Sequence, residues 1–359
     1  MRLGHNEYRI NYALLAPALA LLVIGLMFVY SASSGYSHNF FPRQLLWVSA
    51  GLACAIVTAL LNSRVYRSYA APIFLAALTA LLLVLIFGEE VHGARSWIGA
   101  GSVRIQPSEF SKIALILIFG RYLSEFEEHR YDARYYAMSF ALLFLPLALI
   151  LLQPDLGTAV ILVPIVLVMF YVSGTRQSLL ALTFLAGVAC LPLVWALLKP
   201  YQKIRFLITW HPETQASKFG YQAIQSKIAV GSGLLAGRGY LHSLQSQLKF
   251  LPERHTDFVY SVIGEEWGFA GCVTVLALYL VMILSGLYIA RQAKSVFGEV
   301  VAVGITALFA THVFMNIGMA IGLMPIIGIP LPLLSYGGSA MLTALIALGL
   351  LQSIYAYDT

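Results

Sequence analysis

Charged residues are scarce in this sequence, in which Asp, Glu, Lys and Arg together make up 11% of 359 residues. Soluble domains average about 25% charged residues, so this composition excludes an ordinary soluble domain. No part of the chain has the composition of a separate soluble module. No nucleic acid is expected as a partner.

Cysteines and nucleotide-binding motifs are also nearly absent. The three cysteines, Cys54, Cys190 and Cys272, all lie inside apolar runs, which indicates packing residues rather than a disulfide framework. The glycine-rich stretch "GSGLLAGRG" contains no G-K-[ST] sequence and follows no strand, so it does not predict a nucleotide phosphate loop. The chain shows no internal repeat strong enough to indicate an inverted-repeat transporter.

Apolar residues are abundant, at 60% of the chain, and the mean hydropathy is +0.82. They form continuous runs of about 17 to 25 residues, the length of a helix that crosses a bilayer. The sequence therefore predicts an all-α integral membrane protein with about ten transmembrane helices, built as a single polytopic domain over residues 1–359. The expected spans are 12–31, 44–61, 70–87, 108–123, 135–152, 155–172, 178–198, 258–290, 299–323 and 332–356.

The distribution of Lys and Arg over the short connections predicts the orientation, because basic residues stay on the cytoplasmic side. One side is rich in basic residues: Arg2, Arg9, Arg64, Arg67, Arg121, Arg130, Arg134, Arg176, Arg291 and Lys294. The short connections of the other side carry only Arg43, Arg95 and Arg104. Both termini are therefore expected in the cytoplasm, and the long connection 199–257, between spans seven and eight, is expected outside.

This long connection has a pattern of its own. The stretch "FGYQAIQSKIAVGSGLLAGRGY", which includes Lys227, has apolar residues at helical spacing and then several glycines. It predicts an amphipathic or re-entrant segment followed by a flexible turn. The basic residues of the connection are either solvated or form a surface for an anionic group at the outer leaflet.

The charged stretch "LPERHTDFVYSVIGEEWGFAG" begins the eighth span, and Asp257 is its central residue. One interpretation is a first-turn acid that is favoured by the helix dipole or paired with Arg254. The other is a general base whose pKa is raised by partial burial among Phe250, Phe258 and Tyr260. Acids at membrane depth are costly, which favours a functional role.

Two neighbours of Asp257 are candidates for the same site. His255 could tune or relay a proton, although a lone histidine is more often a hydrogen-bonded structural group. His255 and Asp257 alone are too few for a metal site. Helical spacing places Glu265 within a quarter-turn of the face of Asp257, so it could line the same cavity. Its alternative is a buried acid paired with a lysine from another span.

The stretch "GARSWIGAGSVRIQPSEFSKIAL" contributes Arg95, Trp97, Glu109 and Lys112. It predicts a helix start that is capped by Ser108. Glu109 and Lys112 are i,i+3 neighbours and could form an ion pair that makes a polar helix end insertable. Alternatively, Lys112 or Arg95 holds a phosphate that Glu109 helps to position.

Three further candidates lie at span boundaries. Asp155, in "LLQPDLGTAV", has a plain explanation in the helix dipole but is also a candidate site residue. Arg43 is expected to extend to lipid headgroups, and it is also a candidate for stabilising phosphate charge. In "MPIIGIPLPLLSYGGSAML", the backbone N–H groups around Ser335 and Tyr336 could bind an anion, or the segment is a simple outer turn. All these segments are expected on one side of the membrane.

Several of these stretches resemble a known family. The stretches "QPSEFSKIAL", "QPDLGTA", "LPERHTDFVYSVIGEEWGFAG" and "GIPLPLLSYGGSAM", together with the region 220–239, are similar to the SEDS proteins of bacterial shape, elongation, division and sporulation. The resemblance covers nearly the whole chain. Its short tails are more similar to the RodA type than to the FtsW type.

The resemblance implies a peptidoglycan glycosyltransferase that polymerises lipid II at the outer face of the bacterial cytoplasmic membrane. The essential aspartate of the family corresponds to Asp257. The resemblance also implies a class B penicillin-binding protein as partner and contact with membrane lipids. No tightly bound cofactor is expected, although Mg²⁺ or Mn²⁺ could bridge phosphates. The alternatives are a lipid II flippase and, less favoured, an ion or proton channel.

Overall fold

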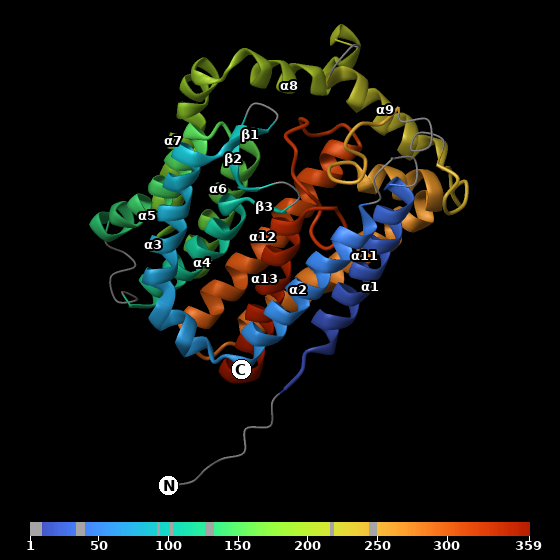
Figure 1. Ribbon diagram of the computed structural model, residues 1–359. Helices are drawn as coiled ribbons and strands as arrows, with labels where there is room; N and C mark the ends of the chain where they lie inside the picture. The colour runs from blue at the N-terminus through green and yellow to red at the C-terminus, as the bar shows by residue number, and fades with distance from the viewer. Residues whose placement is uncertain are drawn as a thin grey trace.

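The computed structural model describes residues 9–33, 40–91, 94–100, 103–125, 133–215, 219–243 and 250–359. Each predicted span coincides with one long helix (Figure 1). In chain order these are α1 (Tyr12–Ser33), α2 (Phe41–Leu60), α3 (Ser63–Phe87), α4 (Pro107–Glu125), α5 (Ala133–Leu152), α6 (Leu156–Val172), α7 (Gln177–Leu197), α11 (Val259–Gln292), α12 (Val296–Ala320) and α13 (Gly338–Asp358).

The helices have the character of a membrane protein. Eight of those described are long and apolar enough to cross a membrane, and α6 is a shorter apolar helix. Many large apolar side chains on the surface of the bundle are exposed, and no residue in the most apolar stretch of α7 is buried. Lipid is the solvent that suits such a surface. The all-α membrane class is confirmed, and the number of crossings stays a prediction.

A small antiparallel sheet was not predicted. It consists of β1 (Glu89–Val91), β2 (Ala94–Ala100) and β3 (Val103–Ile105), paired in that order. Two of the strands are three residues long, which is too short for a hydrophobic period to show in the sequence. The sheet closes the connection between α3 and α4 and carries Trp97 toward the bundle.

Helices α12 and α13 occupy the centre of the bundle and are its most buried long helices. In Figure 1, α1, α2 and α11 lie on one side of them and α3 to α7 on the other. The approach of α2 to α13 is close because Gly349 lies against the backbone of α2. A Cβ atom on Gly349 would lie 2.5 Å from the carbonyl oxygen of Ala55, so glycine is required there.

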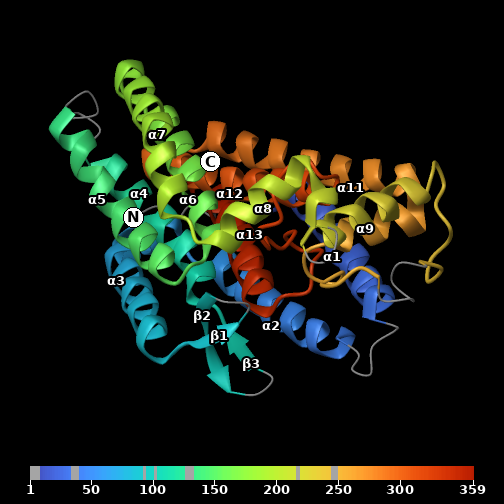
Figure 2. The ribbon, with the colours of Figure 1, turned by 90° about the horizontal axis from the view of Figure 1, so that it is seen from above.

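The long connection between α7 and α11 is largely helical. It contains α8 (Pro200–Trp210), a 3₁₀ turn η2 (Pro212–Gln215) and α9 (Phe219–Ser232). Figure 2, which looks down on this end of the bundle, shows α8 and α9 running across it between α7 and α11. The sheet lies at the same end, whereas the C-terminus lies at the opposite end (Figure 1).

The glycine-rich turn after α9 is not the flexible turn that the sequence predicted. Helix α11 is broken at Gly268, whose φ of 63° lies in the left-handed region. The turn 233–239 packs into this break and bonds with it: Phe269 N donates to Leu234 O (2.8 Å), and Arg238 N donates to Glu265 O (3.0 Å). The glycines of the turn allow its backbone to approach the backbone of α11 closely. The hydrogen bonds that form there hold the turn in place.

Candidate active site

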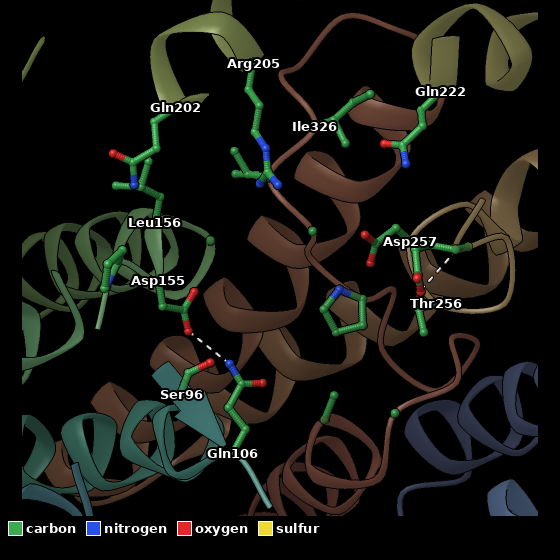
Figure 3. Close-up of a pocket in the computed structure, with 18 of the residues that line it drawn as sticks. Ser96, Gln106, Asp155, Leu156, Gln202, Arg205, Gln222, Thr256, Asp257 and Ile326 are labelled. Carbon is green, nitrogen blue, oxygen red and sulfur yellow. Dashed lines mark hydrogen bonds between the residues drawn. The ribbon is translucent and has the colours of Figure 1, made fainter. Parts of the chain in front are cut away.

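A cavity of about 530 Å³ opens at the end of the bundle that α8 and α9 cover. Its lining comes from segments far apart in the sequence: β2, the start of α6, one face of α8, residues 252–257, and the segments before α13. Figure 3 shows Asp257 and Thr256 on one wall, Asp155 and Gln106 on another, and Arg205 between them. Most of the predicted segments therefore meet at one place.

Asp257 occupies the last turn before α11, with its side chain partly buried on the cavity wall. Its backbone N–H donates to Glu253 O (3.0 Å), and its carbonyl accepts from Asn316 Nδ2 (2.9 Å). No residue in the described part of the chain donates a hydrogen bond to its carboxylate. Burial and, to a lesser extent, the charge of Glu253 raise the pKa of Asp257, against the opposing charge of Arg205, to about 7. The group is thus poised to accept a proton near neutral pH.

Arg205 is a site residue that the sequence analysis did not single out. It lies on α8, where Tyr201, Gln202, Arg205 and Phe206 share the face toward the cavity. Burial lowers the pKa of the guanidinium, and the negative charge of Asp257 partly opposes this. The spacing of these four residues on one helical face was the available signal, but the predicted boundaries left α8 inside a connection.

Asp155 connects three elements of the opposite wall. As the N-cap of α6, its Oδ1 accepts from Thr158 N (3.1 Å), while its Oδ2 accepts from Gln106 Nε2 (2.9 Å) and Ser108 Oγ (3.2 Å). The predicted capping of α4 by Ser108 is wrong, because α4 begins at Pro107, a residue suited to the first turn, and the Ser108 hydroxyl bonds to Asp155 instead. Asp155 therefore fixes this wall as well as facing the cavity.

Glu109 and Lys112 form the ion pair that was one of the two predictions for them. Lys112 Nζ lies 2.7 Å from Glu109 Oε1 and 3.0 Å from His312 Nε2 on α12. Both side chains are buried, and neither lines the cavity. The alternative, in which Lys112 binds a substrate phosphate directly, does not fit this placement. The contact of Lys112 with His312 could not be predicted, because the two residues are far apart in the sequence.

Glu265 does not lie on the cavity wall, contrary to the prediction. It is buried in α11 and accepts a hydrogen bond from Ser243, while the adjacent Glu266 accepts from Ser31 of α1 and from Leu241 N. A lysine partner for Glu265 stays a prediction. The helical-wheel argument failed because Asp257 precedes the helix and so does not share its phase.

His255 and its neighbour Arg254 hold the loop rather than line the cavity. The His255 ring stacks on Phe40 with 4.3 Å between ring centroids, and burial lowers its pKa. Arg254 is fully buried, and its Nε donates to the carbonyl of Ala32 at the end of α1 (2.6 Å). The predicted relay from His255 to Asp257 has no support in this arrangement, since the two side chains face different surroundings.

The turn at Ser335 and Tyr336 is not the predicted anion site. Its N–H groups are already bonded: Ser335 N to Leu331 O, Tyr336 N to His255 O (2.8 Å), and Gly337 N to Gln44 Oε1 (3.3 Å). The Tyr336 side chain does line the cavity. Burial raises the pKa of the Tyr336 phenol, and the charge of Arg43 and a hydrogen bond with it act in the opposite direction. Arg43 therefore reaches the cavity rim through Tyr336.

Of the remaining predicted residues, one lines the cavity and two are exposed elsewhere. Trp97 lines the cavity, whereas Arg95 is exposed on the sheet. Lys227 is exposed on α9 with its stem against Gly322. In the described part of the chain, Arg205 is the only Lys or Arg in the lining. The lining also includes the three acids Asp155, Glu253 and Asp257.

A metal centre made by the protein alone is not evident in the ranges that the structure covers. No group of three or more His, Cys, Asp or Glu side chains there could hold a metal ion. Two carboxylates that belong to one short loop, those of Glu253 and Asp257, line the cavity. Such a donor set suits a Mg²⁺ ion that binds mainly to substrate phosphates.

The comparisons with known proteins agree with one another. Residues 12–359 match the FtsW/RodA/SpoVE family, described as "Cell cycle protein". The peptidoglycan glycosyltransferase MrdB of Escherichia coli K12 is 37% identical over 353 residues, covering 98% of this chain and 95% of that protein. The peptidoglycan glycosyltransferase RodA of Treponema pallidum is 35% identical over 422 positions, covering 96% and 97%.

Solved structures give the same result. A chain in a structure of a peptidoglycan synthase complex that coordinates polymerization and crosslinking superposes with a TM-score of 0.81 at 31% identity, covering 96% of this chain and 97% of that one. The crystal structure of the rod shape determining protein RodA of Thermus thermophilus gives a TM-score of 0.74 at 29% identity, covering 99% and 100%. This chain therefore belongs to the FtsW/RodA/SpoVE family, the SEDS proteins that its motifs resemble.

Proposed function

We propose that this protein is a peptidoglycan glycosyltransferase that polymerises lipid II at the outer face of the bacterial cytoplasmic membrane. Its relatives MrdB and RodA carry the name peptidoglycan glycosyltransferase. A flippase is not favoured, because its substrate path requires polar groups through the full depth of the bundle. Here the cavity and its ionisable groups lie at one end.

The observation that carries the proposal is the state of Asp257 in this cavity. A carboxylate that is partly buried, free of donors from the described residues, and raised in pKa to about 7 is suited to take a proton. In the proposed reaction, Asp257 takes the proton of the 4-hydroxyl of one GlcNAc as this oxygen attacks C1 of MurNAc on a second molecule. General-base help of this kind contributes about 10² to 10⁴ in rate.

The departing group is a polyprenyl pyrophosphate, and Arg205 is placed to stabilise its charge. A guanidinium binds phosphate oxygens with two parallel hydrogen bonds, and its charge acts strongly in a partly desolvated site. Arg43, which contacts Tyr336, is a second candidate at the rim. A divalent cation would supply further neutralisation of the phosphates, held by them and by Glu253 or Asp257.

The direction of attack follows from the linkage of donor and product. Lipid II carries its sugar on an α-linked phosphate and the glycan bond is β, so a single displacement inverts the configuration. The acceptor hydroxyl and the pyrophosphate must then lie on opposite faces of the sugar. Asp257 and Arg205 come from different segments of the cavity lining, the loop before α11 and helix α8, which leaves room for this separation (Figure 3).

The other cavity residues are proposed to orient the substrates. Trp97 and Tyr336 offer aromatic surface for sugar rings, and Gln106, Gln202 and Gln222 offer amides for hydroxyl and acetamido groups. The Asp155 cluster holds this wall rigid, which keeps the reacting groups in register. Glu109, Lys112, His255 and Glu265 are proposed to support the site from behind rather than to touch substrate.

We also propose that residues 1–359 form a single polytopic domain and that a class B penicillin-binding protein is the partner that supplies crosslinking. One of the similar solved chains comes from a peptidoglycan synthase complex, which supports such an assembly. The outward orientation of the cavity is proposed from the excess of basic residues on the short connections at the opposite end.

The test is polymerisation of purified lipid II by the purified protein, with Asp257→Asn and Asp257→Ala as variants. The wild type should make glycan and both variants should make at least about 100-fold less. Parallel reactions with EDTA, Mg²⁺ or Mn²⁺ decide whether a cation takes part. Movement of labelled lipid II across sealed vesicles without polymer, or polymer formed by Asp257→Asn at the wild-type rate, would refute the proposal.

A further inference from the structure

Helix α12 carries two buried polar side chains one turn apart, His312 and Asn316. Both face the extended segment that leads to α13. The ring nitrogen Nδ1 of His312 lies 3.2 Å from the carbonyl oxygen of Pro330, and Asn316 Nδ2 donates to the carbonyl oxygen of Ile329 (2.7 Å). Helix α12 therefore holds this segment, which forms part of the cavity wall, at two successive residues.

Asn316 makes a second contact that His312 does not. Its Nδ2 also donates to the carbonyl oxygen of Asp257 (2.9 Å). One amide nitrogen therefore joins the loop that carries Asp257 to the segment that contains Ile329. An amide nitrogen carries two hydrogens, which allows two carbonyl oxygens to be bound at once. Asn316 is completely buried, and its Oδ1 has no partner in the described part of the chain.

We propose that Asn316 is a positioning residue for the glycosyl transfer reaction, which fixes the backbone of Asp257 relative to the cavity. This inference rests on the proposed function of Asp257 but assigns a separate role to a residue that does not line the cavity. Asp257 lies in a loop, and a base on a loop needs an anchor on a rigid element to keep its geometry. A central helix of the bundle provides that anchor.

The two hydrogen bonds of Asn316, to the carbonyls of Ile329 and Asp257, differ in whether a neighbouring contact could take over their role. If Asn316 is lost, His312 still holds the wall segment through Pro330, so this segment should move little. The carbonyl of Asp257 has no comparable second anchor, although its N–H remains in the turn through Glu253. Loss of Asn316 should therefore loosen the Asp257 loop selectively.

A loosened Asp257 no longer lies where it can reach the acceptor hydroxyl. The rate at saturating substrate should then fall because the base is misplaced.

The experiment compares Asn316→Leu, which has a similar volume and no donor, with Asn316→Ser, which can donate one hydrogen bond. The control is Thr343→Val on α13, since the Thr343 hydroxyl is buried, has no partner among the described residues and does not line the cavity. For Asn316→Leu we expect kcat to fall about 100-fold with KM changed less than about threefold. Asn316→Ser should be intermediate, and Thr343→Val should match the wild type.

Hydrogen–deuterium exchange of the purified proteins provides a readout that does not need substrate. In Asn316→Leu, exchange should increase in residues 250–258 and remain near the wild-type level in 326–330. Wild-type kcat in Asn316→Leu or unchanged exchange in 250–258 would overturn the positioning role. A wild type that makes no polymer would instead refute the proposed function, and the exchange data would still decide on the anchor.

Discussion

Replacing Asp257 by Asn should make the protein more stable at alkaline pH while it abolishes polymer synthesis. In the folded protein burial holds the proton on Asp257, raising its pKa from the ordinary 3.8 to about 7. The unfolded chain releases this proton at a lower pH. Stability that is present below about pH 4 is therefore lost as the pH rises to about 7, because the folded state must then accommodate a buried charge.

The size of this effect follows from the pKa. A rise from 3.8 to about 7 corresponds to about 4 kcal/mol, at about 1.4 kcal/mol for each pH unit. Part of the side chain faces the open cavity, and solvent there screens the charge, so about 1–3 kcal/mol is the expected loss. Asn has nearly the same shape and no charge, so Asp257→Asn should recover this amount above pH 7.

The assay is thermal unfolding in detergent at a series of pH values from 4 to 9, for the wild type and Asp257→Asn. The difference between their midpoints should favour the variant above pH 7 and shrink steadily toward pH 4. Glu253→Gln is a useful comparison, because removing this neighbouring acid should lower the pKa of Asp257 and reduce the pH-dependent loss.

One result would refute this reasoning. If the difference in midpoint between the wild type and Asp257→Asn is the same at pH 4 and pH 8, the carboxylate has an ordinary pKa in the folded protein. The argument for Asp257 as a base poised near neutral pH would then lose its physical basis. The acid limb of polymerisation should likewise have its midpoint near pH 7 in the wild type.

Three other predictions test separate parts of the structure. Arg205→Gln should lower kcat by at least about tenfold and Arg205→Lys by less, measured with lipid II; equal rates would show that no charge is needed there. Gly237→Ala should reduce folded protein in the membrane, because its φ is +79° and a Cβ would lie 2.1 Å from Glu266 O, whereas Gly231→Ala has open space and should be neutral. Lys112→Met should cost about 3–5 kcal/mol by leaving Glu109 unpaired, seen as a lower unfolding midpoint; a raised KM without that loss would restore a substrate role.

The long helices could be predicted because each apolar run is about as long as a bilayer is thick. Asp257 could be predicted for a related reason, since an acid next to an apolar span is costly and needs an explanation. Both inferences use local sequence. The convergence of Asp155, Asp257 and Tyr336 on one cavity also followed from the number of crossings between them, since each lies at the same end of the bundle.

The errors arise where a role depends on distant residues. The choice between an ion pair and a phosphate ligand for Lys112 stayed open, because nothing in its own segment shows that His312 lies 3.0 Å away. Arg205 was overlooked because α8 was counted as part of a connection. Without a predicted helix there, no residues could be assigned to a face toward the cavity. Glu265 was misplaced because a regular helix was assumed from Asp257 onward, whereas α11 begins at Val259 and breaks at Gly268.

The break in α11 has a consequence for how the chain reaches its native state. In an unbroken helix, the N–H groups of Phe269 and Ala270 would bond to the carbonyls of Glu265 and Glu266. Here all four groups bond instead to the turn 233–239, which leaves the ribosome earlier. Helix α11 cannot complete its hydrogen bonding until the turn 233–239 packs against it. The folding of α11 is thus coupled to the placement of the connection that precedes it.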